Sequence, residues 1–148
     1  MVDKLDLKIL TILRKDARVS YRKIAEKLGV ATGTIQNRIQ KMEKEGIITD
    51  YHVGINLNKL GYNIAAIIGI CIDRKEANKI EKKLINNKNV FAVYSVTGEY
   101  DLLVATRFKT MNELDNFIRK ELSNESILKT NTFIILNISK ETFSFLDK

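Results

Sequence analysis

The stretch VSYRKIAEKLGVATGTIQNRIQKMEKEGII, residues 19–48, decides the fold of the first part of this chain. Its apolar residues recur at helical spacing on both sides of Gly29: Ile24, Ala25, Leu28, Ile35, Ile39 and Met42. Glycine adopts a positive φ without steric cost, so Gly29 can end the first helix within one residue. The stretch therefore predicts two helices joined by a tight turn, which is typical of a helix-turn-helix.

The outward face of the second predicted helix is polar and basic. Arginine, asparagine, glutamine and threonine are the side chains that reach base edges and phosphates in the major groove of DNA. We expect the residues Thr32, Thr34, Gln36, Asn37 and Arg38 to face the groove, and Ser20, Arg22, Lys23 and Lys41 to position the phosphates. From this stretch alone, an ordinary helical hairpin with a solvated outer face is the alternative.

The flanking residues complete a three-helix unit. Asp3 can cap a helix over residues 4–15, and Ser20 can cap the helix that begins at Tyr21. The third helix is expected to run to about residue 45. Its start is weak because Ala31 cannot cap, so either Thr32 caps one residue later or the first turn frays. After it, residues 48–55 read as a short extended linker strand or a wing.

Composition limits the chemistry that the chain can perform. The 148 residues carry a net charge of +7, and residues 1–60 contribute 12 Lys and Arg against seven Asp and Glu. This positive excess suits a polyanion partner. The chain has one cysteine, Cys71, which we expect to be buried, and one histidine, His52, which we expect in the extended segment. Two such residues cannot form a Cys/His metal cluster. The sequence also contains no phosphate-binding glycine loop. We expect no cofactor, no metal, no membrane span and no enzyme activity, and a cytoplasmic location.

The second half follows a different pattern. Apolar runs of strand length alternate with helical periodicity, and the expected strands cover residues 64–72, 90–97, 102–108 and 127–138. The expected helices cover residues 76–86, with Ile80, Leu84 and Ile85 on one face, and residues 111–122. The order β-α-β-β-α-β predicts a ferredoxin-like domain, with both helices on one face of an antiparallel sheet. The chain is thus expected to be α+β, with domains at residues 1–60 and 61–148.

The first strand of this domain is apolar at both parities, as Ile67, Ile68 and Ile70 show. Helices can cover only one face of the sheet. We therefore expect the other face to pair with a second subunit.

A basic helix-turn-helix followed by a βαββαβ domain resembles the Lrp/AsnC (leucine-responsive, feast/famine) family of transcriptional regulators. The resemblance covers essentially the whole chain. It rests on LDLKILTILRKDARVSYRKIAEKLGV, on residues 35–39, on SVTGEYDLLVATR with its Gly-x-Tyr-Asp turn, and on KTNTFIIL. The family usually has serine at the start of the recognition helix, where this chain has Ala31.

The resemblance implies a sequence-specific regulator of transcription that binds double-stranded DNA. It implies homodimers that pair sheet to sheet and assemble into octamers. It further implies an amino-acid effector near Gly98, Tyr100, Asp101, Thr130 and Thr132. Gly98 and Asp101 could equally serve only the turn between two strands, and Tyr100 could be an interface residue.

Two other functions are alternatives to this interpretation. A nucleoid-packaging protein with little sequence preference would use the same basic face. Its affinity for a specific site would exceed its non-specific affinity only slightly, whereas that of a regulator would exceed it strongly. A metabolic enzyme or its regulatory subunit is disfavoured, because assignment of the two domains leaves no residues for an active site.

Overall fold

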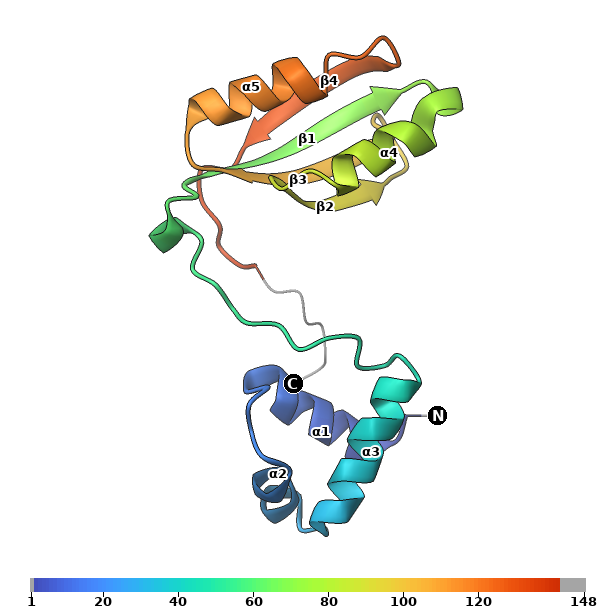
Figure 1. Ribbon diagram of the computed structural model, residues 1–148, viewed down its shortest axis with the longest axis vertical. Helices are drawn as coiled ribbons and strands as arrows, with labels where there is room; N and C mark the ends of the chain where they lie inside the picture. The colour runs from blue at the N-terminus through green and yellow to red at the C-terminus, as the bar shows by residue number, and fades with distance from the viewer. Residues whose placement is uncertain (1, 142–148) are drawn as a thin grey trace. The chain divides into compact units, whose positions relative to one another are not determined.

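The computed structural model describes residues 2–141 and divides into two compact units, one extending to Gly54 and the other covering Ile55–Lys140 (Figure 1). The N-terminal unit is helical, and the second unit holds a sheet with two helices. Within the described part of the chain, every helix is too short or too polar to cross a bilayer.

The N-terminal unit contains α1 (Lys4–Lys15), α2 (Tyr21–Leu28) and α3 (Thr32–Lys44), as predicted to within one residue. Asp3 caps α1 by accepting hydrogen bonds from the backbone N–H groups of Leu5 and Asp6. Ser20 caps α2 through Lys23 N–H. Gly29 ends α2 in the left-handed region at φ +67°, so the tight turn is confirmed.

The three helices enclose one apolar cluster, and its buried members are Ile9, Leu13, Ile24, Ala25, Ile35, Ile39 and Met42. Its α2 and α3 members are the stripe residues that the helical spacing selected, apart from Leu28, which is half-buried at its edge. Because each helix hides only a narrow stripe, most of the α3 surface remains open to solvent.

One of the two alternatives for the start of α3 is excluded, and one expectation for this unit was wrong. Thr32 does not cap α3: Ala31 occupies the cap position, no side chain closes it, and Thr32 is the first helical residue. Residues 48–55 form no strand in the described structure, because no second strand lies beside them to supply ladder hydrogen bonds. His52 accordingly sits in irregular chain with 81% of its side chain exposed.

The C-terminal unit begins with a single 3₁₀ turn at Asn58–Leu60 and contains one four-stranded antiparallel sheet in the order β2-β3-β1-β4. Its elements are β1 (Ile64–Ile72), α4 (Ala77–Ile85), β2 (Val90–Ser95), β3 (Leu102–Phe108), α5 (Met111–Glu121) and β4 (Ile127–Ile134). This is the predicted ferredoxin-like topology. β1 lies at the centre and pairs with both β3 and β4.

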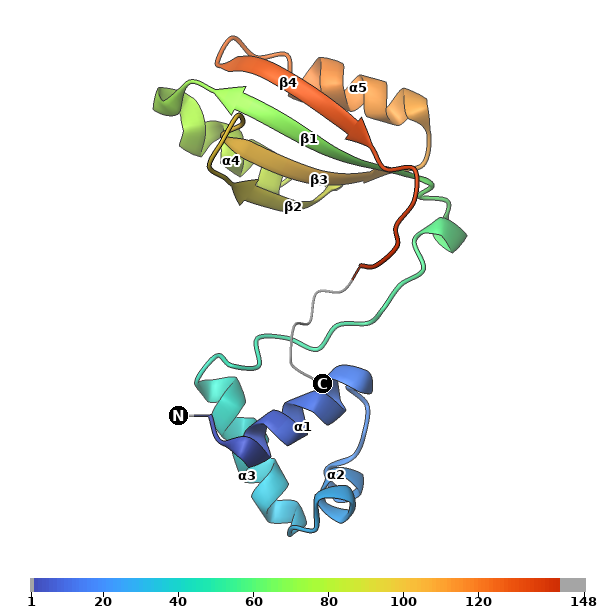
Figure 2. The same cartoon turned by 180° about the vertical axis from the view of Figure 1, so that it is seen from behind.

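Strand parity separates the two faces of the sheet. Even-numbered β1 residues, among them Ile68 and Ile70, are buried beneath α4 and α5 (Figure 1). The odd-numbered β1 residues point to the opposite face, hereafter the outer face. No helix or strand of the described unit crosses the outer face (Figure 2). Ile67, Tyr94 and Phe133 are 37%, 54% and 48% exposed there.

Smaller differences concern where elements end. β2 stops at Ser95, and β4 stops at Ile134, which pairs with Ala66 near the start of β1. Ile85, expected on the buried face of α4, is 63% exposed because it is the last residue of that helix. Helix ends lose their packing partners first, and periodicity does not show where this happens.

The open cap of α3 gives the first prediction. The backbone at Ala31 already has an extended, cap-like conformation with φ −70° and ψ 145°. Ala31→Ser should therefore satisfy an orphan N–H group and stabilise the chain by about 0.5–2 kcal/mol. Thermal unfolding followed by circular dichroism measures this gain. Ala17→Ser, an exposed substitution outside any cap, is the matched control, and equal shifts in the two variants would contradict the capping argument.

Candidate nucleic-acid interface and ligand-binding face

The outward face of α3 is a continuous polar surface. Gln36, Asn37, Gln40, Lys41 and Lys44 are all exposed, and they lie opposite the buried stripe of the same helix. Asparagine and glutamine can bond adenine in two places, and lysine can contact guanine or phosphate. The face thus combines donors and acceptors for base edges with cations for the backbone.

Three of the four residues expected to contact phosphates lie near the start of α2, and the fourth, Lys41, lies on α3. Ser20 is occupied as a cap acceptor, but its hydroxyl proton remains available to a phosphate. Arg22 is 83% exposed at its side chain and pairs with Glu26 at 2.9 Å. Lys23 is exposed. The left-handed turn at Gly29, with Val30 N–H bonded to Ala25 O at 3.1 Å, joins this group to α3.

Arg38 has partners that local sequence pattern does not reveal. Its Nη1 donates to Asp3 Oδ2 at 2.6 Å and to Asp6 Oδ1 at 2.9 Å. Asp3 is the N-cap of α1 and Asp6 lies in its first turn, and both precede Arg38 by more than 30 residues. The Asp6 residue is buried, being 7% exposed. Arg38 therefore connects α3 to α1. The sequence suggested a guanidinium that is free to face the groove, but in the structure it is bound to two carboxylates.

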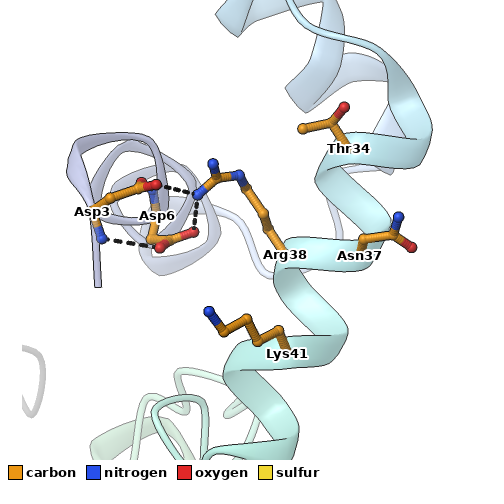
Figure 3. Close-up of a pocket in the computed structure, with 6 residues that line it drawn as sticks. All are labelled: Asp3, Asp6, Thr34, Asn37, Arg38 and Lys41. Atoms are coloured by element: carbon orange, nitrogen blue, oxygen red, sulfur yellow. Dashed lines mark hydrogen bonds and ion pairs between the residues drawn. The ribbon is translucent and has the colours of Figure 1, made fainter. Parts of the chain in front are cut away.

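The same residues line a shallow depression of about 390 Å³ beside α3, together with Thr34, Asn37 and Lys41. Figure 3 shows Arg38 directed at the two carboxylates, whereas the side chain of Asn37 points away from them. Of the residues expected in the groove, Thr34 and Arg38 thus lie on the flank facing α1. Gln36 and Asn37 lie on the open face.

The cluster also shifts the charge equilibrium of its members. The backbone N–H of Asp6 and the Arg38 guanidinium stabilise the Asp3 carboxylate and lower its pKa from 3.8 to about 2. The two aspartates in turn raise the pKa of Arg38. Asp3 and Arg38 are therefore both charged at neutral pH, and their ion pair lies beside α3.

A second arrangement of interest lies on the outer face of the sheet. The loop between β2 and β3 folds across β1 so that the Tyr100 ring covers Gly69. A Cβ atom at residue 69 would lie 2.8 Å from Cγ and Cδ1 of that ring. The Tyr100 hydroxyl accepts a hydrogen bond from Asn131 Nδ2 at 3.1 Å, and Phe133 packs edge-on to the ring at 6.4 Å.

Asp101 fixes this loop to the sheet. Its backbone N–H donates to Ile70 O at 3.0 Å, and its carboxylate accepts from Ile72 N–H at 2.9 Å. The carboxylate lies where the β1–β3 ladder ends and β1 changes register. Gly98 has φ +114°, which a larger residue would adopt only with strain. Both residues therefore have a structural function in the turn.

An exposed ion pair borders Tyr100. Lys129 Nζ lies 2.7 Å from Glu99 Oε1 and 5.8 Å from the centre of the Tyr100 ring. This contact lowers the pKa of Glu99 and raises the pKa of Lys129. Cys71, expected to be buried, is half-buried here, and its thiol donates to Glu99 O at 3.2 Å. The loop therefore brings one acid, one base and one aromatic ring together.

The structure separates the residues that the sequence grouped as an effector site. Thr130 pairs with Ile70 and Thr132 with Ile68, and residues directly opposite in an antiparallel pair share a face. Both threonines therefore lie on the helix side, across the sheet from Tyr100. Lys129, Asn131 and Phe133 lie on the outer face instead. Sequence reasoning missed them, although strand parity would have selected them once the pairing partner was known.

Comparisons with known protein families match both units. The model described as winged helix-turn-helix DNA-binding covers residues 2–49. The model described as Lrp/AsnC ligand binding domain covers residues 65–145. The described structure contains no strand in the place of a wing.

Similar proteins agree with this division. An uncharacterized HTH-type transcriptional regulator of Pyrococcus abyssi is 44% identical over 143 residues, which is 97% of each chain. The solved structure of Escherichia coli AsnC has a TM-score of 0.90 at 28% identity and covers 96% of this chain and 97% of its own. A Neisseria meningitidis regulator solved as an L-Met complex has a TM-score of 0.93 at 22% identity and covers 99% of this chain and 97% of its own.

The Arg38 cluster gives the second prediction. Arg38→Ala removes both ion pairs, leaves the buried Asp6 carboxylate with only the hydrogen bond from Asp3 N–H, and should lower the melting temperature. Because the pKa of Asp3 is depressed, its share of this stabilisation should be complete above about pH 4 and lost as pH falls towards 2. Melting curves of both proteins from pH 7 to pH 2 test this. Arg119→Ala breaks an exposed helix pair and should change little, so an equal loss there would refute the proposed link.

Proposed function

The chain belongs to the Lrp/AsnC family of transcriptional regulators, and on that premise we propose that it recognises a specific DNA sequence through α3 and is tuned by a small metabolite. It is a DNA-binding regulator, and regulators of this family are not enzymes. The observation that carries the proposal is the exposed polar face of α3, held at a fixed angle to α2 by the Gly29 turn. Because the protein acts on DNA, we propose that it is located in the cytoplasm.

We propose a division of labour among the DNA-contacting residues. Gln36 and Asn37 read base edges, while Ser20, Arg22, Lys23 and Lys41 position the phosphates. Thr32 and Thr34 contact the backbone at the helix start. Arg38 uses one terminal nitrogen for Asp3 and Asp6, so its Nε and Nη2 groups remain for DNA. A guanidinium held in place by carboxylates loses less conformational freedom when it binds than a free one does.

We further propose that the protein acts as a homo-oligomer. A second copy would cover the outer face of the sheet, where Ile67, Tyr94 and Phe133 are exposed. A dimer presents two recognition helices, and helix-turn-helix dimers read half-sites spaced about 34 Å or a multiple of it. We also propose that these dimers assemble into an octamer.

For the effector we propose an amino acid bound beside the loop that contains Gly98, Tyr100 and Asp101. Glu99 and Lys129 offer opposite charges for an α-amino and an α-carboxylate group, and the Tyr100 ring offers an apolar wall. The structural neighbour solved with L-Met has the same fold. The geometry favours Lys129 and Asn131 over Thr130 and Thr132 as the β4 contribution.

The DNA proposal is tested by titrating the purified protein with DNA from upstream of its own gene and with scrambled DNA, over a series of salt concentrations. A sequence reader should prefer the native fragment by about 10³-fold or more. Asn37→Ala should remove about 1–3 kcal/mol of this preference. Lys23→Ala should weaken both DNAs alike and reduce the salt slope by about one.

The control variant is Lys79→Ala, which removes an exposed lysine on α4 of the other unit. It should bind both DNAs as the wild type does. Equal wild-type affinity for native and scrambled DNA, falling steeply with salt, would contradict sequence reading and favour the packaging function.

The effector proposal is tested by adding amino acids to the same assay and following oligomer mass by light scattering. Gly69→Ala forces the Tyr100 ring to move. It should cost about 1–3 kcal/mol of stability through overpacking and abolish the response to the amino acid, while ligand-free DNA binding persists. Tyr100→Phe, which keeps the ring and loses only the bond to Asn131, should weaken the response. Gly54→Ala meets no atom within 4 Å and is the control. A normal response in Gly69→Ala would place the effector elsewhere.

A further inference from the structure

A second cavity lies wholly within the C-terminal unit and shares no residue with the Tyr100 loop. It has a volume of about 510 Å³ and opens between α5, the loop before α5 and the loop before β2. Its lining residues are Tyr62, Asn87, Lys88, Asn89, Lys109, Glu113, Asn116, Phe117, Lys120 and Glu121. Neither DNA reading nor the proposed effector loop uses any of them.

The charges around this cavity are not balanced. Lys88, Lys109 and Lys120 reach it from three different segments of the chain. The two acids are already engaged: Glu113 accepts a hydrogen bond from Lys109 N–H at 2.8 Å, and Glu121 pairs with Lys83 at 3.0 Å. Within residues 2–141, neither Lys88 nor Lys120 has a carboxylate within ion-pair distance. Three lysines therefore share the lining with two carboxylates, and one of these carboxylates, Glu121, is paired with Lys83 outside the lining, so the cavity has a positive excess.

The walls are held in place by the fold. Asn89 donates through Nδ2 to Arg107 O at 2.8 Å and accepts from Arg107 N–H at 2.9 Å, which fixes the Lys88 loop to the end of β3. Phe117 is buried against Phe108, with ring centres 5.4 Å apart. Lys109 Nζ lies 5.3 Å from the centre of the half-buried Tyr62 ring. These contacts hold part of the cavity wall in place, which reduces the reorganisation that ligand binding requires.

From these observations we propose that the cavity binds a phosphate-bearing small molecule of mononucleotide size. Lysine ammonium groups supply the charge that a phosphate requires, and the amide N–H groups of Asn87 and Asn116 can donate to its oxygens. The half-buried Tyr62 provides an apolar surface for a planar ring. The volume falls in the range of about 300–1,000 Å³ that small-molecule sites occupy.

Phosphate could also come from the DNA backbone. Backbone contacts use exposed basic surfaces that follow the duplex, whereas here the lysines line a cavity together with the Tyr62 ring and three asparagines. The shape therefore favours a small molecule, and the experiment includes DNA as a separate arm.

The test is calorimetric titration of the full-length protein at low salt with AMP, with inorganic phosphate and with adenosine. AMP should bind with saturation at one site per chain, phosphate should compete for it, and adenosine should bind at least tenfold more weakly. The double variant Lys88→Gln/Lys120→Gln should weaken AMP binding at least tenfold, because each lost charge-assisted bond is worth about one factor of ten or more. Asn116→Asp, which adds a carboxylate to the lining, should do the same.

The matched control is Lys79→Gln/Lys82→Gln, which removes two exposed lysines of α4 outside the cavity and should leave AMP binding intact. Absence of saturable AMP binding, adenosine binding as tight as AMP, or equal losses in both double variants would overturn the proposal. A second outcome would also overturn it: the wild type binds no AMP, and Lys88→Gln/Lys120→Gln loses affinity for native and scrambled DNA alike. The site would then be assigned to the DNA backbone.

Discussion

The C-terminal unit depends on the pairing of β1 with strands on both of its sides. Ile64–Ile72 lies between β3 and β4, so its backbone N–H and C=O groups are satisfied within the sheet. A strand in this position is flanked by protein on both edges, and its even-numbered side chains form the centre of the core beneath α4 and α5. This placement also fixes which residues of β3, β4 and the Tyr100 loop can meet. The separation of Thr130 from Tyr100 is a direct consequence of it.

The N-terminal unit depends on a different kind of constraint. Its apolar cluster is small, because three short helices can hide only narrow stripes, and a domain of this size gains little free energy from burial alone. The Asp3–Asp6–Arg38 cluster adds directional contacts between α1 and α3 at the margin of that core. Polar contacts of this kind fix the position of the recognition helix more narrowly than apolar packing does. The position of Asn37 relative to α2 is therefore set partly by residues at the beginning of the chain.

Most of the fold could be predicted from the sequence because it is encoded locally. Periodicity located α1, the α2–α3 turn and β1, and cap residues such as Asp3 and Ser20 fixed where helices begin. What failed depends on partners distant in sequence. The Arg38 contacts span more than 30 residues, the faces of Thr130 and Thr132 depend on the register against β1, and residues 48–55 lacked a strand with which to pair. The outward face of α3 was identified because burial of Ile35, Ile39 and Met42 alone determines it.

The contact between Gly69 and Tyr100 has a consequence for how this protein can change over generations. The ring occupies the volume that any other side chain at residue 69 would need. A larger residue on the strand therefore becomes acceptable only after the ring has been replaced by something smaller, and the opposite order meets a steric barrier. Residues 69 and 100 are therefore evolutionarily coupled. Tyr100 must be replaced by a smaller residue before Gly69 can be replaced by a larger one.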